Sequence, residues 1–307
     1  MLGAAGNAKG ALFMAIAMAA FAINDGFLKL AFETLPVAQS IFVRGLMAST
    51  IIVLVCWYAG ALKFRPAKGE RGPIAWRIIG ELGATGTFML ALAHVDIATA
   101  TAVLQAAPLA VTMAAALLLS EPVGWRRWSA IAVGFCGMLL IVRPGGDVSF
   151  WLVFAVISVG FITLRDIATR MMSTRVPTLY LSALSAVAIT VGALLLTPIE
   201  GWVALSLREV APLMCSAILI LVGYSFITLA MRSGEISAVA PFRYTVLVVS
   251  IAVGYLFFGT LPDTLTLIGA AIIVGAGLYT IYREWRLRRE RSAFAPRRRT
   301  SPGESAI

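Results

Sequence analysis

The sequence has little charge for its length. Only 13% of its 307 residues are Asp, Glu, Lys or Arg, whereas about a quarter of the residues in an ordinary globular domain are charged. Hydrophobic residues make up 60% of the chain, and the mean hydropathy is +0.91. A soluble fold is therefore excluded. In a soluble protein, a net charge of +10 would indicate binding to nucleic acid. Because this chain is not soluble, we expect no nucleic-acid partner.

Histidine and cysteine are also scarce, which excludes several kinds of catalytic site. A single histidine cannot supply an HExxH motif or a multi-histidine metal site. The three cysteines lie in apolar stretches without CxxC spacing, so we expect neither disulfide bonds nor a zinc site. The chain lacks GxxxxGK, the motif of P-loop ATPases. We expect no enzyme, no cofactor and no metal; an intramembrane enzyme or a membrane scaffold is the remote alternative.

Long apolar segments, separated by Pro, Gly and charged residues, follow one another along the chain. They lie near 10–31, 36–58, 74–95, 99–119, 126–143, 150–171, 178–197, 210–231, 238–259 and 264–282. Each is close to the roughly 20 residues that cross a bilayer as a helix. The sequence therefore predicts an all-α polytopic membrane protein with ten transmembrane helices.

Lysine and arginine are unequally distributed over the connections. With the N-terminus in the cytoplasm, 19 of these residues lie on the cytoplasmic side, and only Lys29, Arg143 and Arg208 lie on the other. Cytoplasmic connections are the ones enriched in basic residues. We therefore expect a bacterial inner-membrane protein with both termini in the cytoplasm. Residues 291–307 are expected to form a basic, disordered tail near anionic lipid.

A shift of about 140 residues aligns the two halves of the chain. The aligned pairs are Asp25 with Asp166, Lys29 with Arg170, Pro36 with Pro177, Asp96 with Glu235, Ile97 with Ile236 and Gly137 with Gly277. These ordered matches predict two five-helix repeats, 1–145 and 146–290. Because five is odd, the second repeat must be inverted, an arrangement typical of secondary transporters with a substrate site near the midplane.

Three segments resemble the EamA branch of the drug/metabolite transporter superfamily. They read AINDGFLKL near residue 22, ALAHVDIATATAVLQAAPLAVTMAAALLLSEPVGWRRW from residue 91, and VAPFRYTVLVVSIAVGYLFFG from residue 239. The resemblance covers residues 8–285. It implies two inverted five-helix repeats, a central cavity lined mainly by the first, third and fourth helices of each, and transport without ATP. Similar proteins include YddG-like exporters of aromatic amino acids and importers of S-adenosylmethionine or riboflavin.

Ionisable residues within the apolar segments are the first functional candidates. They are Asp25, Arg44, Glu81, Arg165, Asp166 and Arg243. A charge at the bilayer centre costs about 2.5–3.5 kcal/mol, so these side chains must face protein or water. We expect Arg44 to pair with Asp25, and Arg165 with Asp166. With Lys29 nearby, such charges either lock the helix packing or act as gates.

Glu81 and Arg243 have no charged counterpart in the other repeat, and we therefore prefer them as direct ligands. The full set of predicted substrate-binding residues is Glu81, Phe88, Gln105, Phe161, Tyr224, Arg243 and Tyr244. Pro108 is expected to break its helix, because proline lacks a backbone donor. Both charge signs together with aromatic faces suit a small zwitterionic or amphiphilic metabolite. The sequence thus favours export of amino acids, including aromatic ones, by alternating access, with import of S-adenosylmethionine or riboflavin as the alternative.

Overall fold

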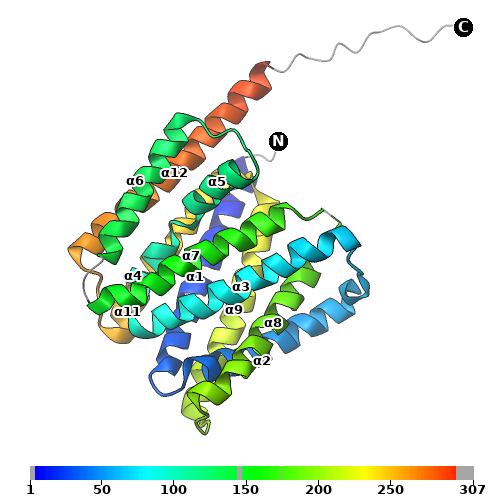
Figure 1. The fold of residues 1–307 in the computed structure, drawn as a ribbon, viewed down its shortest axis with the longest axis vertical. Helices are drawn as coiled ribbons and strands as arrows, with labels where there is room; N and C mark the ends of the chain where they lie inside the picture. Colours follow the sequence, from blue (N-terminus) through cyan, green and yellow to red (C-terminus); the bar gives the residue numbers. More distant parts are fainter. Residues whose placement is uncertain (1–3, 144–146, 174, 295–307) are drawn as a thin grey trace, which may run out of the picture.

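A computed structural model describes residues 4–143, 147–173 and 175–294, and this part of the chain is helical without strands (Figure 1). The first half contains α1 (Ala4–Phe32), α2 (Val37–Tyr58), the short 3₁₀ helix η1 (Ala61–Lys63), α3 (Lys68–His94), α4 (Ile97–Leu104), α5 (Ala107–Leu118) and α6 (Trp125–Val142). The second half contains α7 (Asp147–Arg170), α8 (Thr178–Glu200), α9 (Leu207–Ser233), α10 (Ile236–Val239), the 3₁₀ helix η2 (Ala240–Tyr244), α11 (Thr245–Phe258) and α12 (Thr264–Phe294).

Nine stretches of the described residues are long and apolar enough to cross a membrane. The α4–α5 pair, over Ile97–Leu118, counts as one of them, and so does Ala240–Phe258. The remaining predicted span, α3, has 27 residues but carries polar side chains such as Arg77 and Glu81. The expected all-α polytopic membrane fold is confirmed.

Two predicted helices are interrupted in the structure. The fourth segment divides into α4 and α5, with Pro108 in the first turn of α5. The ninth divides into α10, η2 and α11, with Pro241 at the start of η2. Proline is tolerated in the first turn of a helix, where its missing N–H has no partner to lose. The first break is a change of hydrogen bonding at Gln105 and Ala106, which keep helical backbone angles, and the second is a 3₁₀ turn.

Helices of one half pack mainly against helices of the other. α1 packs on α9, just as α3 packs on α7; α2 packs on α8, and α6 on α12. The contact of α1 with α11 has its counterpart in the contact of α7 with α4 and α5. If each helix is replaced by its counterpart in the other half, the α1–α9 pair becomes the α7–α3 pair. The α2–α8 and α6–α12 pairs stay the same. The packing is therefore compatible with the expected inverted repeat.

Two glycines allow the closest of these helix pairs to approach. A Cβ on Gly223 of α9 would lie 2.5 Å from the ring of Phe21 in α1. A Cβ on Gly83 of α3 would lie 2.4 Å from the ring of Phe161 in α7. The two contacts are related by the same shift of 140 residues. Small residues at such contacts are typical of packing within membranes.

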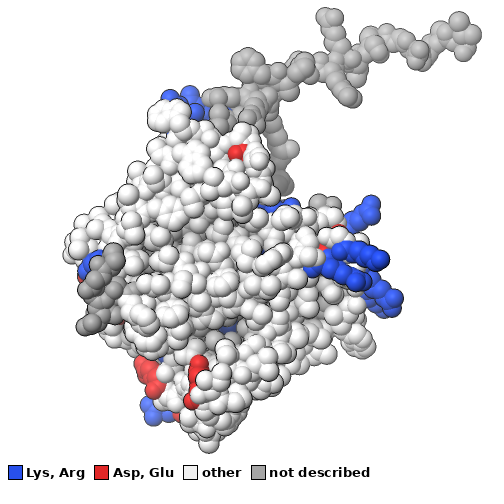
Figure 2. Space-filling view, viewed as in Figure 1, with Lys and Arg blue, Asp and Glu red and all other residues white. Residues whose placement is uncertain are grey.

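The outer surface of the bundle is apolar. Large exposed hydrophobic residues occur on many helices, including Leu118, Leu195, Val248 and Leu256. Figure 2 shows a broad face that is almost free of charged side chains, with Lys and Arg gathered at its edges. Apolar residues facing outward are what a hydrocarbon environment requires.

Candidate functional site

A cavity of about 2250 Å³ lies inside the bundle. Its lining includes residues from α2, α3, α5, α7, α8, α9, η2 and α12. Asn7 near the start of α1, Arg232 near the end of α9 and Trp285 in α12 belong to it. The cavity therefore opens on the side of the bundle where the chain starts and where α12 ends.

Polar contacts close the opposite side. Gln39, at the start of α2, donates from Nε2 to the carbonyl of Val203 over 2.6 Å, and its Oε1 accepts from the Val203 N–H over 2.9 Å. Lys29 near the end of α1 donates to the carbonyls of Leu92 and Val95 at the end of α3, over 2.6 and 2.8 Å. Lys29, expected among the gate or structural charges, thus caps the carboxyl end of α3 on this side.

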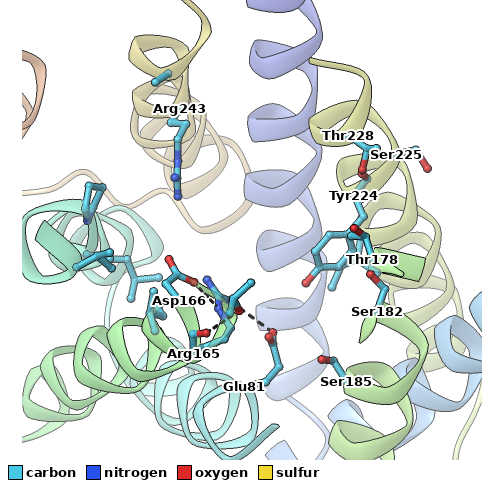
Figure 3. Close-up of a pocket in the computed structure, with 18 of the residues that line it drawn as sticks. Glu81, Arg165, Asp166, Thr178, Ser182, Ser185, Tyr224, Ser225, Thr228 and Arg243 are labelled. Carbon is cyan, nitrogen blue, oxygen red and sulfur yellow. Dashed lines mark hydrogen bonds and ion pairs between the residues drawn. The ribbon is translucent and has the colours of Figure 1, made fainter. Parts of the chain in front are cut away.

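Four charged side chains form a cluster on the cavity wall (Figure 3). Arg165 Nη1 lies 3.5 Å from Glu81 Oε1, and Arg165 Nε lies 2.9 Å from Asp166 Oδ1. Arg77 Nη2 lies 3.9 Å from Glu81 Oε2. The Glu81 side chain is 9% exposed and that of Asp166 37% exposed. Glu81 is therefore held between two guanidinium groups, whereas Asp166 remains open to the cavity.

A glycine in α3 brings this cluster together. A Cβ on Gly80 would lie 2.7 Å from the backbone nitrogen of Arg165. The absence of a side chain at Gly80 lets the backbone of α7 approach α3 directly beside Glu81. Close backbone contact places the guanidinium of α7 within reach of the carboxylate of α3.

Arg243 lies on η2, on another wall of the cavity. Among the described residues, it has no hydrogen bond or ion pair with any other. Figure 3 shows its side chain pointing from η2 toward Asp166 and Arg165. An unpaired guanidinium in such a cavity is a ready partner for a carboxylate or phosphate.

Tyr244 follows Arg243 and orients this turn. It is buried, and its hydroxyl lies over the backbone of α12 at Gly277, where a Cβ would come within 1.7 Å of Oη. Tyr224 of α9 lies across the cavity, with its hydroxyl pointing inward (Figure 3), and its ring packs edge-on against Phe21. Gln105, between α4 and α5, also lines the cavity.

The structure thus brings five of the predicted binding residues to one cavity and leaves out Phe88 and Phe161. Phe88 is 7% exposed and belongs to the main hydrophobic core. Phe161 packs on Gly83 between α3 and α7. Both lie on predicted cavity helices but on faces that contact other helices. We assign them to packing rather than to ligand binding.

A second polar cluster connects α1 with α2 and α9. Asn24 is 2% exposed, and its Oδ1 accepts from Ser216 Oγ over 2.6 Å and from Arg44 Nη1 over 3.5 Å. Its Nδ2 donates to Asp25 Oδ1 over 2.8 Å. The expected pairing of Arg44 with Asp25 is therefore bridged by Asn24. This residue was missed because an uncharged amide beside Asp25 gives no signal of its own.

Among the residues that the structure describes, there is no group of three or more His, Cys, Asp or Glu that could hold a metal ion.

Comparison with known proteins defines the family. Residues 8–143 match the EamA-like transporter family. The chain is 31% identical over 206 residues to the S-adenosylmethionine uptake transporter of Rickettsia bellii, covering 64% of this chain and 67% of that protein. The chain belongs to the EamA-like transporter family. It is therefore a multi-pass membrane transporter of small metabolites and not an enzyme.

Other relatives of this EamA-like transporter differ in substrate and direction. It is 28% identical to the pseudopaline exporter CntI of Pseudomonas aeruginosa, over 87% of this chain and 94% of that protein. It is 32% identical to a riboflavin transporter of Rhizobium johnstonii, over 65% and 66% of the two chains. A crystal structure shares the fold, with a TM-score of 0.62 and 16% identity over 91% of this chain and 99% of the other.

Proposed function

We propose that this EamA-like transporter exports amino acids and amino-acid-like metabolites by alternating access. The observation that carries the proposal is the unpaired guanidinium of Arg243, which faces the partly exposed carboxylate of Asp166 across the cavity (Figure 3). A substrate with a carboxylate and an ammonium group matches these two charges. Riboflavin has neither group, so its recognition would need other contacts.

The ammonium partner in this proposal is Asp166 and not Glu81. Glu81 accepts from two arginines and is nearly buried, so an ammonium group would have to displace a guanidinium to reach it. Asp166 uses one oxygen for Arg165 and is more exposed. Charge-assisted hydrogen bonds of this kind are roughly twice as strong as neutral ones.

Tyr224 supplies the surface for the substrate side chain. Tyr224 is 50% exposed, and hydroxyl groups of Ser182, Ser225 and Thr228 lie nearby (Figure 3). An aromatic ring stacks or packs edge-on against another ring with a gain of about 0.5–1.5 kcal/mol beyond burial. The site therefore accommodates aromatic as well as aliphatic side chains.

We infer export from the similarity to an exporter over most of the chain, and a cavity open to the cytoplasm is compatible with it. We place the two repeats at 1–145 and 146–290, as the shift of about 140 residues indicates, and both termini in the cytoplasm, as the lysines and arginines indicate. The cavity then opens to the cytoplasm, with the contacts of Gln39 and Lys29 closing the other side. A cytoplasmic substrate can enter this state directly. The similarity to an exporter over almost the full chain supports the same direction.

Import of S-adenosylmethionine is the second candidate, favoured by the identity to uptake transporters over about two thirds of the chain. That metabolite carries both charge signs and an aromatic base. Its net charge is positive, however, and the cavity is lined by more arginines than carboxylates. Its affinity for such a cavity is therefore expected to be lower than that of a zwitterion.

Counterflow in proteoliposomes tests the proposal. Purified protein is reconstituted with unlabelled phenylalanine, leucine, S-adenosylmethionine or riboflavin inside, and uptake of the labelled compound is followed. We expect counterflow with amino acids, reduced at least about tenfold in both Arg243→Gln and Asp166→Asn, since each loses a charge-assisted contact. Counterflow with S-adenosylmethionine or riboflavin alone would contradict the proposal.

A further inference from the structure

The charges on the cavity wall are not balanced. The described lining residues include six arginines and three carboxylates. Two of these arginines, Arg77 and Arg165, belong to the cluster with Glu81 and Asp166. This cluster contains two positive and two negative charges, so it contributes no net charge to the cavity.

Two further lining arginines have polar partners that lie outside the lining. Arg170 at the end of α7 pairs with Glu121 over 3.0 Å. Arg44 is connected to Asp25 through the amide of Asn24. Arg170 is therefore paired directly with a carboxylate, whereas Arg44 reaches Asp25 only through the Asn24 amide.

The remaining charged lining residues are Arg232, Glu235 and Arg243. Arg232 and Glu235 lie at the two sides of the α9–α10 connection, where both are exposed and opposite in sign. Arg243, which is also exposed, lies on η2, and its side chain points toward the Asp166 cluster (Figure 3). Counting Arg232 against Glu235, its neighbour across the α9–α10 connection, leaves one positive charge, which we assign to Arg243 because its side chain points toward the Asp166 cluster.

An excess charge matters most when the cavity closes. During alternating access both sides must be shut at once, and water that screens Arg243 in the open state is largely removed. A zwitterion supplies one charge of each sign, so a closed cavity that holds a zwitterion would keep its one excess positive charge. A substrate with net charge −1 makes the closed cavity neutral. This is favourable because an uncompensated charge at the membrane centre is costly.

We propose that the preferred substrate is an amino acid or amino-acid conjugate with one more carboxylate than ammonium groups. One carboxylate of the substrate binds Arg243, and its ammonium group binds Asp166 or the cluster around it. The second carboxylate supplies the negative charge that balances the excess positive charge of the cavity wall. This inference rests on the proposed function and narrows it to net-anionic metabolites. Arg243 is the specificity-determining residue, because its charge alone sets the excess.

Matched substrates test the inference by counterflow. Glutamate and glutamine have nearly the same shape and differ by one negative charge. 4-Carboxyphenylalanine and phenylalanine also differ by one negative charge, which the added carboxylate of the first carries. The wild-type protein should transport the anionic member of each pair at least about tenfold faster, because an uncompensated charge shifts an equilibrium by more than that. In Arg243→Gln the preference should disappear or reverse.

The control is Arg208→Gln, which makes the same chemical change at an exposed arginine in the first turn of α9, outside the cavity. It should keep the wild-type preference. Equal or faster transport of glutamine and phenylalanine by the wild type would overturn the inference while leaving the proposed function intact. Transport of none of the four compounds would overturn both. A preference for anions that persists in a folded Arg243→Gln protein would also overturn the assignment.

Discussion

Replacing Glu81 by glutamine tests whether this carboxylate stabilises the fold or binds substrate. The substitution removes the negative charge between Arg77 and Arg165 while keeping the size of the side chain. Removing one partner of a buried ion pair costs about 3–5 kcal/mol, and an exposed pair is worth about 0–1 kcal/mol. Glu81 is nearly buried, but its pairs are long, at 3.5 and 3.9 Å, and Arg165 keeps Asp166. We therefore expect a loss of about 2 kcal/mol, between these limits.

Thermal unfolding in detergent measures this loss, and substrate binding to the same sample separates stability from affinity. We expect Glu81→Gln to melt at a clearly lower temperature and to bind substrate with an affinity within about threefold of the wild type, which is under 1 kcal/mol. The matched control is Asp166→Asn, which should lower affinity more than stability. A Glu81→Gln protein with wild-type stability but no measurable binding would refute the assignment of Glu81 to the ion-pair cluster.

Three further results are expected. Gly80→Ala should lower the melting temperature by the equivalent of about 1–3 kcal/mol, because the new Cβ would force the α7 backbone away, and it should also reduce transport. Gln39→Ala should weaken the closed side and make it more accessible to impermeant thiol reagents, as measured on nearby engineered cysteines. Hydrogen bonds from Thr266 and Arg143 lower the pKa of Asp263 to about 2 from 3.8, so its ion pair stabilises the fold fully above about pH 4 and is lost as the pH falls through 2. The melting difference between wild type and Asp263→Asn should therefore be small, constant from pH 7 to about 5, and absent near pH 2.

The helices were largely predictable, because hydrophobic length is a direct physical signal. Nine segments are apparent from composition alone, and α3 was expected despite its polar residues. Its start was placed near residue 74, after Pro73, whereas α3 begins at Lys68 with Pro73 inside it. The break near Pro108 follows from the missing backbone donor of proline. The second break, at η2, was not predicted, although Pro241 carries the same signal.

The site was only partly predictable, since a position on a helix does not give the direction of its side chain. Arg243 and Tyr224 lie in the cavity as expected. Glu81 was expected to be a ligand because no charge aligns with it in the other repeat. Its two arginine partners come from its own helix and from α7, and the second contact depends on Gly80, so only the three-dimensional packing shows it. Phe161 was expected in the cavity, yet it packs on Gly83, just as Phe21 packs on Gly223.

Cysteine labelling in the cavity tests the central claim that this space is the substrate path of a transporter open to the cytoplasm. Ser182 of α8 lines the cavity and is half-buried, so Ser182→Cys is made in a background from which the three native cysteines have been removed. An impermeant thiol reagent is applied to inside-out and right-side-out vesicles, with and without glutamate or phenylalanine. We predict faster labelling in inside-out vesicles and a slower rate when substrate is present. Labelling confined to right-side-out vesicles, or a rate that neither compound changes, would contradict the account.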